Sequence, residues 1–255
     1  MGNFVNHLEE IIQEGIEAGS HDYSPDPRKG HFRASNLPYC SRKLVFQHFL
    51  RWDYPRESPI MLARNAGIAI HKFLQGLMDS DPIQIEEKVE IELEGLKLMG
   101  HADLIILDLD RYYVLLDIKT TDNSEAIAAN GPKKAHVAQL VIYLVAVSEK
   151  LRRENRAEKP LWGVLWYLDR RNSISELLNS ENWQFFDIEL DDAKKELIAT
   201  LVKKGKRIQR MVTQGLLPEI DAEPWECSNQ AAVCPYYTLC HEDYLERIAE
   251  IDSHR

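Results

Sequence analysis

Apolar side chains recur every three or four positions in several segments, which is the spacing of one face of a helix. The first such segment has apolar residues at positions 4, 8, 11, 12 and 16. A second follows Ser35, which stands where an N-cap would, and it places Cys40 near the start of a helix. The spacing predicts further helices over 63–78 and 133–147, and a long amphipathic helix over 191–215 that ends at Gly215.

Between residues 83 and 121 the period changes to alternation of apolar and polar residues, which is typical of strands. Three runs occur there, over 83–93, 94–110 and 111–121, with a turn at Gly95. Because short turns join them, we expect an antiparallel meander. Two later runs rich in aromatic and branched side chains, 160–170 and 182–190, add further strands.

The alternation of strands and helices indicates an α/β fold. The chain has 255 residues and no repeat, low-complexity tract or Gly/Ser-rich linker, so we expect one elaborated domain. Its expected parts are an N-terminal helix and loop (1–34), a core (35–215) and a cysteine-bearing C-terminal segment (216–255).

The composition, with 44% hydrophobic and 28% charged residues, is that of a folded globular protein. The longest nearly apolar stretch, 135–147, is too short to span a bilayer, so we expect no membrane partner. The first residues lack a basic region followed by an apolar run, which predicts a cytoplasmic protein. The formal net charge of -10 argues against a protein that coats nucleic acid, but it allows carboxylates that reach phosphates through divalent metals.

Three charged residues on the meander strands are candidates for chemistry. Asp117 and Lys119 are two apart in a strand, so their side chains emerge on one face. Asp103 lies on the preceding strand, where hairpin pairing would bring it beside Asp117. Two adjacent carboxylates can hold a hard divalent cation, and a neighbouring Lys can stabilise charge on a phosphoryl group. The Asp-Ile-Lys run alone also fits a structural salt bridge at a strand end.

Three polar residues on expected helices accompany these charges. Gln139 and Tyr143 are four apart and share a helix face, from which both can bond to a nucleic-acid strand or to Lys119. His71 lies on the helix expected over 63–78. Each also fits a purely structural role: Gln139 and Tyr143 as a helix-surface pair, Tyr143 as a hydrogen-bonded core tyrosine, and His71 as a structural histidine.

The order and spacing of these residues resembles the RecB-like branch of the PD-(D/E)xK nucleases, over about residues 35–170: His71, Gly100 to Asp103, Asp117 to Lys119, and Gln139 to Tyr143. The resemblance implies a restriction-endonuclease-like core with a central mixed sheet flanked by helices. It implies that His71, Asp103 and Asp117 bind Mn²⁺ or Mg²⁺, and that the backbone carbonyl of Ile118 completes the ligand set. Lys119 would then activate water or stabilise charge, and Gln139 and Tyr143 would contact DNA and the Lys.

Four cysteines in a reducing compartment are poor candidates for disulfides, so ligation is the better hypothesis. One early cysteine, Cys40, and three late ones, Cys227, Cys234 and Cys240, resemble the iron-sulfur RecB-like nucleases. These include CRISPR-associated exonucleases, the AddB nuclease domain and the eukaryotic Okazaki-flap nuclease-helicase. The resemblance implies a 4Fe-4S cluster that joins an N-terminal helix to the C-terminal segment. The family usually has CxxC first, and Ala231 stands where its middle cysteine would, so a Zn site and unrelated buried cysteines stay open.

Basic residues cluster in 150–159 and 203–210. They fit solvated helix faces, or contacts to DNA phosphates at the mouth of the site that Arg33, Arg42 and Lys43 would join.

The sequence contains no GxxxxGK[ST], GxSxG or HExxH motif, which disfavours a helicase motor, a serine hydrolase and a zincin. We therefore expect a metal-dependent DNA nuclease, with single-stranded DNA exonuclease activity of 5′ to 3′ polarity as the commonest case in the resembled family. Its protein partners would belong to CRISPR adaptation, phage recombination or repair. Two alternatives stay open: a DNA-binding scaffold with a structural cysteine site and a vestigial nuclease site, and a Zn-ribbon-like interaction module.

Overall fold

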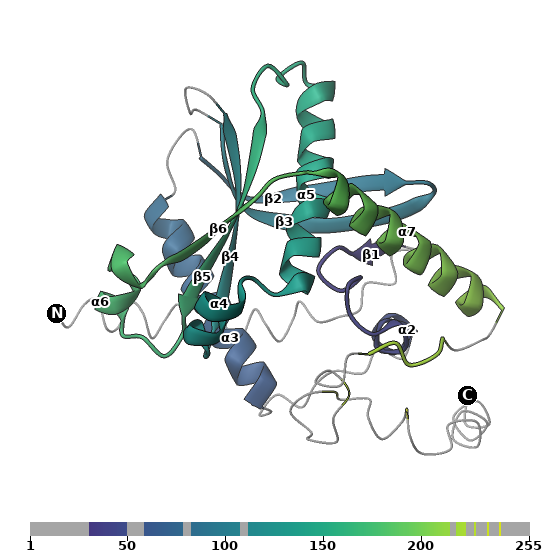
Figure 1. Ribbon diagram of the computed structural model, residues 1–255, viewed down its shortest axis with the longest axis horizontal. Coiled ribbons are helices and arrows are strands. Elements are labelled where there is room, and N and C mark those ends of the chain that lie inside the picture. Colours follow the sequence, from purple (N-terminus) through teal and green to yellow (C-terminus); the bar gives the residue numbers. More distant parts are fainter. Residues whose placement is uncertain are drawn as a thin grey trace.

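Six strands form one mixed sheet in the part of the chain that the structure describes (Figure 1). This computed structural model describes residues 31–49, 59–78, 83–107, 112–214 and 218–222, together with Cys227, Cys234 and Cys240. The strands are β1 (His31–Arg33), β2 (Ile83–Leu93), β3 (Leu96–Ile106), β4 (Tyr113–Thr121), β5 (Leu161–Asp169) and β6 (Gln184–Ile188). Their order is β1-β3-β4-β5-β6, and β2 also pairs with β3. The helix expected over residues 4–16 lies outside the described residues.

Strands β2, β3 and β4 form the expected antiparallel meander. β2 and β3 pair from Ile83 opposite Ile106 to Leu93 opposite Leu96, and the turn between them is Glu94 and Gly95. β5 then lies parallel to β4, and β6 is antiparallel to β5. The expectation of a central mixed sheet is confirmed.

One edge of β3 is shared by two strands. β2 covers nearly all of β3, so β1 and β4 must both pair along the opposite edge, at residues 97–99 and 104–106 respectively. Among the described strands, none pairs with residues 100–103 on that edge. β4 continues beyond Leu116 with β5 alone, and Figure 1 shows β2 and β3 running away from β4–β6. The sheet therefore opens where β3 and β4 separate, at Asp103 and Asp117.

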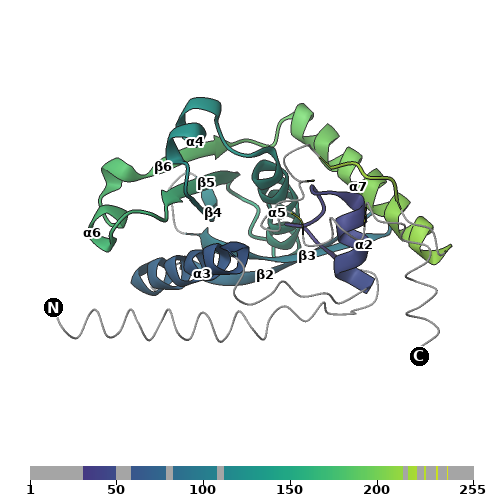
Figure 2. The same cartoon turned by 90° about the horizontal axis from the view of Figure 1, so that it is seen from below.

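Helices cover both faces of this sheet. The helices are α2 (Ser41–Phe49), α3 (Pro59–Met78), α4 (Ser124–Asn130), α5 (Lys134–Arg153), α6 (Ile174–Leu177), the 3₁₀ turn η1 (Ser180–Asn182) and α7 (Asp192–Thr213). Leu165 packs in the hydrophobic cluster that contains α5 and α7, and its neighbour Trp166 packs in the cluster that contains α3. Successive strand residues point to opposite faces, so α3 lies on one face and α5 with α7 on the other. In Figure 2, β4–β6 are seen between α3 and α4.

The start of α2 differs from the expected one. The helix begins at Ser41 rather than after Ser35, whose hydroxyl instead lies 3.5 Å from the side chain of Asn36 in a turn. Pro38 disfavours helical geometry at the residue before it, which moves the helix start downstream. The cap comes from a distant residue, because the Asp221 carboxylate accepts from the Ser41 N–H at 2.5 Å and from its hydroxyl at 2.6 Å.

The C-terminal segment lies against this same helix start, as expected. Arg42 donates from Nε to the carbonyl of Pro218 at 2.9 Å and from Nη1 to the carbonyl of Cys240 at 3.3 Å. Lys204 of α7 also approaches Asp221, at 3.2 Å. Long-range contacts of this kind join the two ends of the described chain.

The remaining helices agree with the sequence pattern apart from the shortest ones. α3, α5 and α7 are confirmed, although α3 begins four residues earlier than expected and α7 ends at Thr213. β1, α4, α6 and η1 were not expected, because seven residues or fewer show no clear periodicity. Side-chain caps mark three of them: Asn123 for α4, the Ser173–Glu176 capping box for α6 and Asn179 for η1. In the described residues, no helix has the length and apolar character needed to cross a membrane.

Candidate active site

The two candidate carboxylates meet where the sheet opens. Pairing of β3 with β4 stops at Leu104 and Leu116, so Asp103 and Asp117 are the next residues on each strand. Asp103 does not continue the backbone ladder. Its carboxylate Oδ2 instead accepts from the N–H of Ile118 at 2.6 Å, which fixes it against the neighbouring strand. Both side chains are buried, with Asp103 8% and Asp117 1% exposed.

A chain of polar contacts extends from Asp117 to α5. The ammonium of Lys119 lies 2.7 Å from Asp117 Oδ2 and donates to Gln139 Oε1 at 3.1 Å. The Gln139 amide donates to Asp117 Oδ1 at 3.3 Å and lies 3.2 Å from the hydroxyl of Tyr143. The structure thus brings Gln139 and Tyr143 of α5 next to Asp117 and Lys119 of β4. At least twenty positions separate the two pairs in the sequence.

His71 reaches the site from α3. Its Nδ1 lies 3.6 Å from Asp103 Oδ2, and its side chain is 22% exposed. The imidazole therefore stands beside the carboxylate and is partly open to solvent.

Burial and neighbouring charges give the two carboxyls opposite pKa shifts. Burial raises the pKa of Asp117 to about 6; the Lys119 ammonium opposes this rise, while the charge of Asp103 adds to it. Burial also disfavours ionisation of Asp103, but His71, Lys119 and the Ile118 N–H outweigh it and hold the pKa of Asp103 below its usual range. Asp117 Oδ2 makes no aligned hydrogen bond despite its short distance to Lys119, so this buried oxygen is incompletely satisfied.

Lys119 stays protonated in this setting. Burial alone would lower the pKa of its ammonium, but the nearby charges of Asp117 and Asp103 raise it above the ordinary value. The ammonium is therefore charged at neutral pH.

Gly100 is required by the tyrosine of the helical pair. A Cβ added at this glycine would meet the Tyr143 hydroxyl and would lie 2.7 Å and 2.8 Å from two ring carbons. Tyr143 is buried and bonded to Gln139, so its ring has little room to move. Any larger residue at position 100 would therefore displace the ring from the site.

Sequence reasoning missed Gln75, one helical turn after His71 on the same face of α3. Its amide donates to the backbone carbonyl of Asp103 at 3.3 Å and to the carboxylate of Glu86 at 2.9 Å. Glu86, opposite Asp103 on β2, has φ 51° and is absent from the β2–β3 pairing. Gln75 thus bonds to both β2 and β3 at the point where Glu86 interrupts their regular pairing. The spacing of four residues from His71 was the available signal.

A second missed contact lies beside Lys119. Tyr167 is the strand partner of Lys119 on β5, and its hydroxyl lies 2.6 Å from Nδ1 of His136. Burial, followed by the charges of Lys119 and Lys133, lowers the pKa of His136 to about 2. His136 is therefore neutral, and the Tyr167 hydroxyl that bonds to its Nδ1 also accepts from the Lys133 N–H at 3.1 Å. The contact between His136 and Tyr167 fixes the first turn of α5, the helix on which Gln139 lies.

The other three cysteines lie close enough to Cys240 to affect its thiol. No disulfide joins them, and Cys40 and Cys234 are buried. Burial raises the pKa of Cys240 to about 12; Arg42 opposes the shift, and Cys234, Cys40 and Cys227 add to it. In the described residues, however, no group of three histidine, cysteine, aspartate or glutamate side chains already forms a metal-binding set, either here or at the carboxylates.

The basic segment over 150–159 is largely paired within the protein. Arg152 and Arg153 lie 2.8 Å and 3.2 Å from the carboxylate of Glu149, and Lys150 pairs with Glu87 on β2. These contacts favour the solvated helix face over contacts to DNA for this segment. Arg42 is likewise engaged with backbone carbonyls, and the Lys43 ammonium lies 5.4 Å from the ring centroid of Tyr39.

Comparison with known families agrees with the nuclease interpretation. Residues 62–241, or 180 of the 255 residues, match the family described as the PD-(D/E)XK nuclease superfamily. The sheet and its flanking helices are consistent with the fold of that class of enzyme. This chain belongs to the PD-(D/E)XK nuclease superfamily, whose members use divalent metals such as Mg²⁺ or Mn²⁺ and whose fold implies a DNA substrate.

Solved structures share the fold at low sequence identity. The crystal structure of SSO0001 has a TM-score of 0.58 and 18% identity, and the match covers 91% of this chain and 95% of that one. LHK-Exo in complex with dAMP gives a TM-score of 0.49 at 14% identity, covering 76% of this chain and 93% of that one. The alkaline exonuclease LHK-Exo from Laribacter hongkongensis gives 0.41 at 14% identity, covering 73% and 95%. No curated protein matches the sequence significantly.

Proposed function

We propose that this chain is a divalent-metal-dependent nuclease of the RecB-like branch that acts on single-stranded DNA as an exonuclease. The observation that carries the proposal is the contact set where β3 and β4 separate. There, a buried carboxylate pair lies beside a buried ammonium, with Lys119 2.7 Å from Asp117 and Asp103 held by the Ile118 N–H at 2.6 Å. Burying three charges together costs free energy, which favours a ligand-binding role over a strand-end salt bridge. The 5′ to 3′ polarity follows only from the resembled family.

The residues at this site fit a hard divalent cation. Asp103 and Asp117 supply carboxylates, His71 an imidazole, and the backbone carbonyl of Ile118 a further oxygen, all donors that Mn²⁺ accepts. Two observations support the fit: Asp117 Oδ2 is buried without an aligned hydrogen bond, and burial, with the charge of Asp103 adding to it, raises the pKa of Asp117. A cation bound there would supply a nucleophilic water at neutral pH.

The remaining residues act on the substrate's charge and on geometry. Lys119, kept protonated by the two carboxylates, stabilises the negative charge that grows on the phosphoryl oxygens. Gln139 contacts Asp117, Lys119 and Tyr143 at once, so it fixes the direction of the ammonium. These positioned donors are what phosphodiester hydrolysis requires beyond the cation.

The cysteines are proposed to hold a 4Fe-4S cluster, with Zn as the alternative. The effect of the other three thiols on the pKa of Cys240 supports their proximity, since burial and like charges penalise thiolates that lack a cation. Arg42 and Asp221 already join α2 to the C-terminal segment. A cluster would strengthen that junction and make residues 1–255 one domain.

Cleavage of end-labelled single-stranded DNA with Mn²⁺ tests the nuclease. Asp117→Asn and Lys119→Ala should each abolish cleavage. Asp169→Asn is the matched control, because Asp169 is a buried carboxylate at a strand end that pairs with a cation two residues later, Arg171, at 2.5 Å. Cleavage by the control and none by the two site variants supports the assignment; retained cleavage by Asp117→Asn refutes it.

The same assay separates the alternatives. A wild-type protein that binds DNA but never cleaves it would be the scaffold with a vestigial site.

The colour and metal content of the protein identify the cysteine site. Freshly purified protein that is brown and contains iron supports the cluster, whereas colourless protein containing zinc supports the Zn site.

A further inference from the structure

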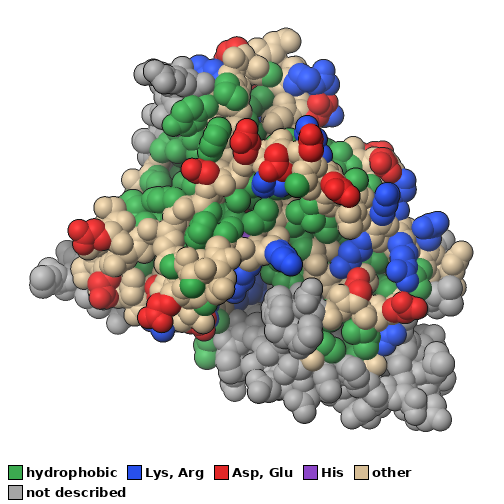
Figure 3. Space-filling view, in the orientation of Figure 1, with side chains coloured by type: hydrophobic (Ala, Val, Ile, Leu, Met, Phe, Trp, Pro, Cys, Tyr) green, Lys and Arg blue, Asp and Glu red, His purple; other side chains and the backbone are tan. Residues whose placement is uncertain are grey.

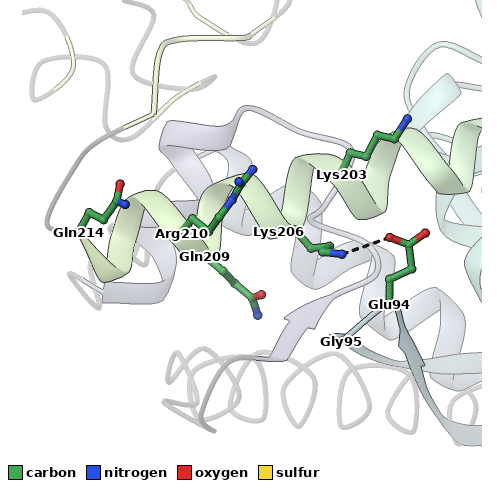
Figure 4. A pocket seen from close by; sticks show the side chains of 7 residues that line it. All are labelled: Glu94, Gly95, Lys203, Lys206, Gln209, Arg210 and Gln214. Carbon is green, nitrogen blue, oxygen red and sulfur yellow. Dashed lines mark hydrogen bonds and ion pairs between the residues drawn. The ribbon is translucent and has the colours of Figure 1, made fainter.

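α7 and the turn between β2 and β3 form a hollow of about 600 Å³ (Figure 4). Its cationic side chains, Lys203, Lys206 and Arg210, come from one stretch of α7. Of the residues that line it, only Glu94 carries a carboxylate, and that group lies 3.2 Å from the Lys206 ammonium. The hollow is therefore positively charged overall, with three cations against one anion.

The close approach of α7 to the hairpin creates this hollow. A Cβ added at Gly205 would lie 2.5 Å from one methyl carbon of Leu96, so the helix rests directly on the end of β3. Lys203, Lys206 and Arg210 follow at intervals of three and four residues, which puts them on neighbouring positions of the helix surface.

Helix stability does not explain these charges. Cations favour a helix only in its last turn, whereas Lys203 and Lys206 lie ten and seven residues before Thr213. Lys203 with Lys206, and Lys206 with Arg210, are like-charge pairs of the spacing that destabilises a helix. Residues 203–210 contain five cations and no carboxylate in a chain of net charge -10. An anionic ligand would relieve this repulsion.

The cations of this stretch are only partly neutralised within the protein. Lys204 approaches Asp221 at 3.2 Å and Arg207 approaches Glu219 at 3.8 Å. Within the described residues, no carboxylate pairs with Lys203 or Arg210, and both are exposed. Lys and Arg side chains gather along α7 in Figure 3.

The hollow lies at the far end of β3 from the candidate active site. Asp103 is eight positions after Gly95, a distance of about 25 Å along the strand. Of the two interpretations of residues 203–210, one placed them at the mouth of the site; the hollow instead lies at the turn of the β2–β3 hairpin, away from the carboxylates. A ligand that uses both places must therefore span about 25 Å, as a nucleic-acid strand of several nucleotides does.

We propose that this hollow, with Lys203 and Arg210 as its principal cations, binds the phosphate backbone of the DNA strand whose end occupies the carboxylate site. This inference rests on the proposed function for the identity of the anion. The hollow would anchor the strand roughly seven nucleotides from the cleaved bond, at 3.4 Å for each nucleotide of a stacked strand. The anchor favours long substrates over short ones.

The test compares two charge-matched double variants of the full-length protein. Lys203→Ala/Arg210→Ala removes the two exposed cations of the hollow. Lys194→Ala/Lys195→Ala removes the same charge from the other end of α7, where the lysines lie 2.5 Å and 2.8 Å from Asp191 and Asp192. Binding of a single-stranded DNA of about 20 nucleotides is measured by fluorescence anisotropy without divalent metal, at several salt concentrations. Cleavage of strands of about 5 and 20 nucleotides is measured with Mn²⁺.

We expect the hollow variant to lose about 1.4 from the slope of log affinity against log salt, since each lost single-strand phosphate contact contributes about 0.7. Its KM for the long strand should rise several-fold with kcat unchanged, and cleavage of the short strand, which spans only about 17 Å, should stay at the wild-type level. The control variant should match wild type in all three measurements.

Two results overturn the inference: an unchanged salt slope in the hollow variant, or an equal loss of slope in the control variant. Either result would mean that Lys203 and Arg210 face an acidic protein segment or solvent instead of DNA. If the wild-type protein cleaves neither strand, the proposed function fails, and the salt slope alone still decides whether the hollow binds DNA.

Discussion

Replacing Gly100 with alanine probes how the fold supports the candidate site. The added Cβ would overlap the hydroxyl of Tyr143 and approach two of its ring carbons to 2.7 Å and 2.8 Å. The ring is 3% exposed and packed in the main hydrophobic cluster, so it cannot swing into solvent. We expect Gly100→Ala to push Tyr143 away from Gln139 and to weaken the contact that orients Lys119.

The size of the effect follows from overpacking. Extra methyl groups forced into a packed core cost about 1–3 kcal/mol. For a chain of this size, each kcal/mol lowers Tm by about 2–4 °C, so Gly100→Ala should melt roughly 2–12 °C below wild type. Cleavage of single-stranded DNA should fall as well, because the Gln139 amide bonds to both the Tyr143 hydroxyl and the Lys119 ammonium.

Thermal melting and DNA cleavage are measured together with a matched glycine. Gly76 lies in α3, and a Cβ added there would meet nothing within 4 Å. Gly76→Ala should therefore stabilise the protein by about 0.5–1 kcal/mol through helix propensity and leave cleavage unchanged. The double variant Gly100→Ala/Tyr143→Leu should recover part of the lost stability, because the smaller side chain makes room for the new methyl group.

Strictly additive Tm changes in that double variant would contradict the steric explanation. So would a Gly100→Ala protein that melts and cleaves like wild type, since the contact distances would then have no consequence.

Three other predictions concern the metals and their ligands. Cys40→Ala should lower both Tm and the bound iron or zinc, because Cys40 would close a loop of 186 residues to Cys227. His71→Ala should lose a larger fraction of activity in Mn²⁺ than in Mg²⁺, because Mn²⁺ accepts an imidazole more readily. Mn²⁺ binding, followed by calorimetry, should weaken as the pH falls from 7 to 5. Burial raises the pKa of Asp117 to about 6, so below that pH a proton occupies the carboxylate that the cation needs.

Each of these has a contrary outcome. Unchanged melting and metal content in Cys40→Ala would remove that thiol from the cluster. Equal fractional losses in the two metals would return His71 to a structural role, and pH-independent Mn²⁺ binding between pH 5 and 7 would exclude Asp117 as a ligand.

The sequence by itself determined the local elements and the pairs of residues that share one element. Alternation over 83–121 specified three strands, because successive side chains of a strand point to opposite faces of the sheet. The same locality put Asp117 beside Lys119 on one strand and Gln139 beside Tyr143 on one helix. Motif order then sufficed to predict the superfamily.

Only the tertiary structure decided which of these pairs meet, and where the chain departs from local rules. Asp103 bonds to the Ile118 N–H because β3 and β4 separate there, a consequence of β1 and β4 sharing one edge of β3. The start of α2 is capped by Asp221, 180 positions away in sequence, which no local N-cap pattern can report. The cations of α7 lie far from the carboxylates because a long hairpin separates them. Periodicity records which face a side chain occupies, whereas the packing of distant elements decides what that face touches.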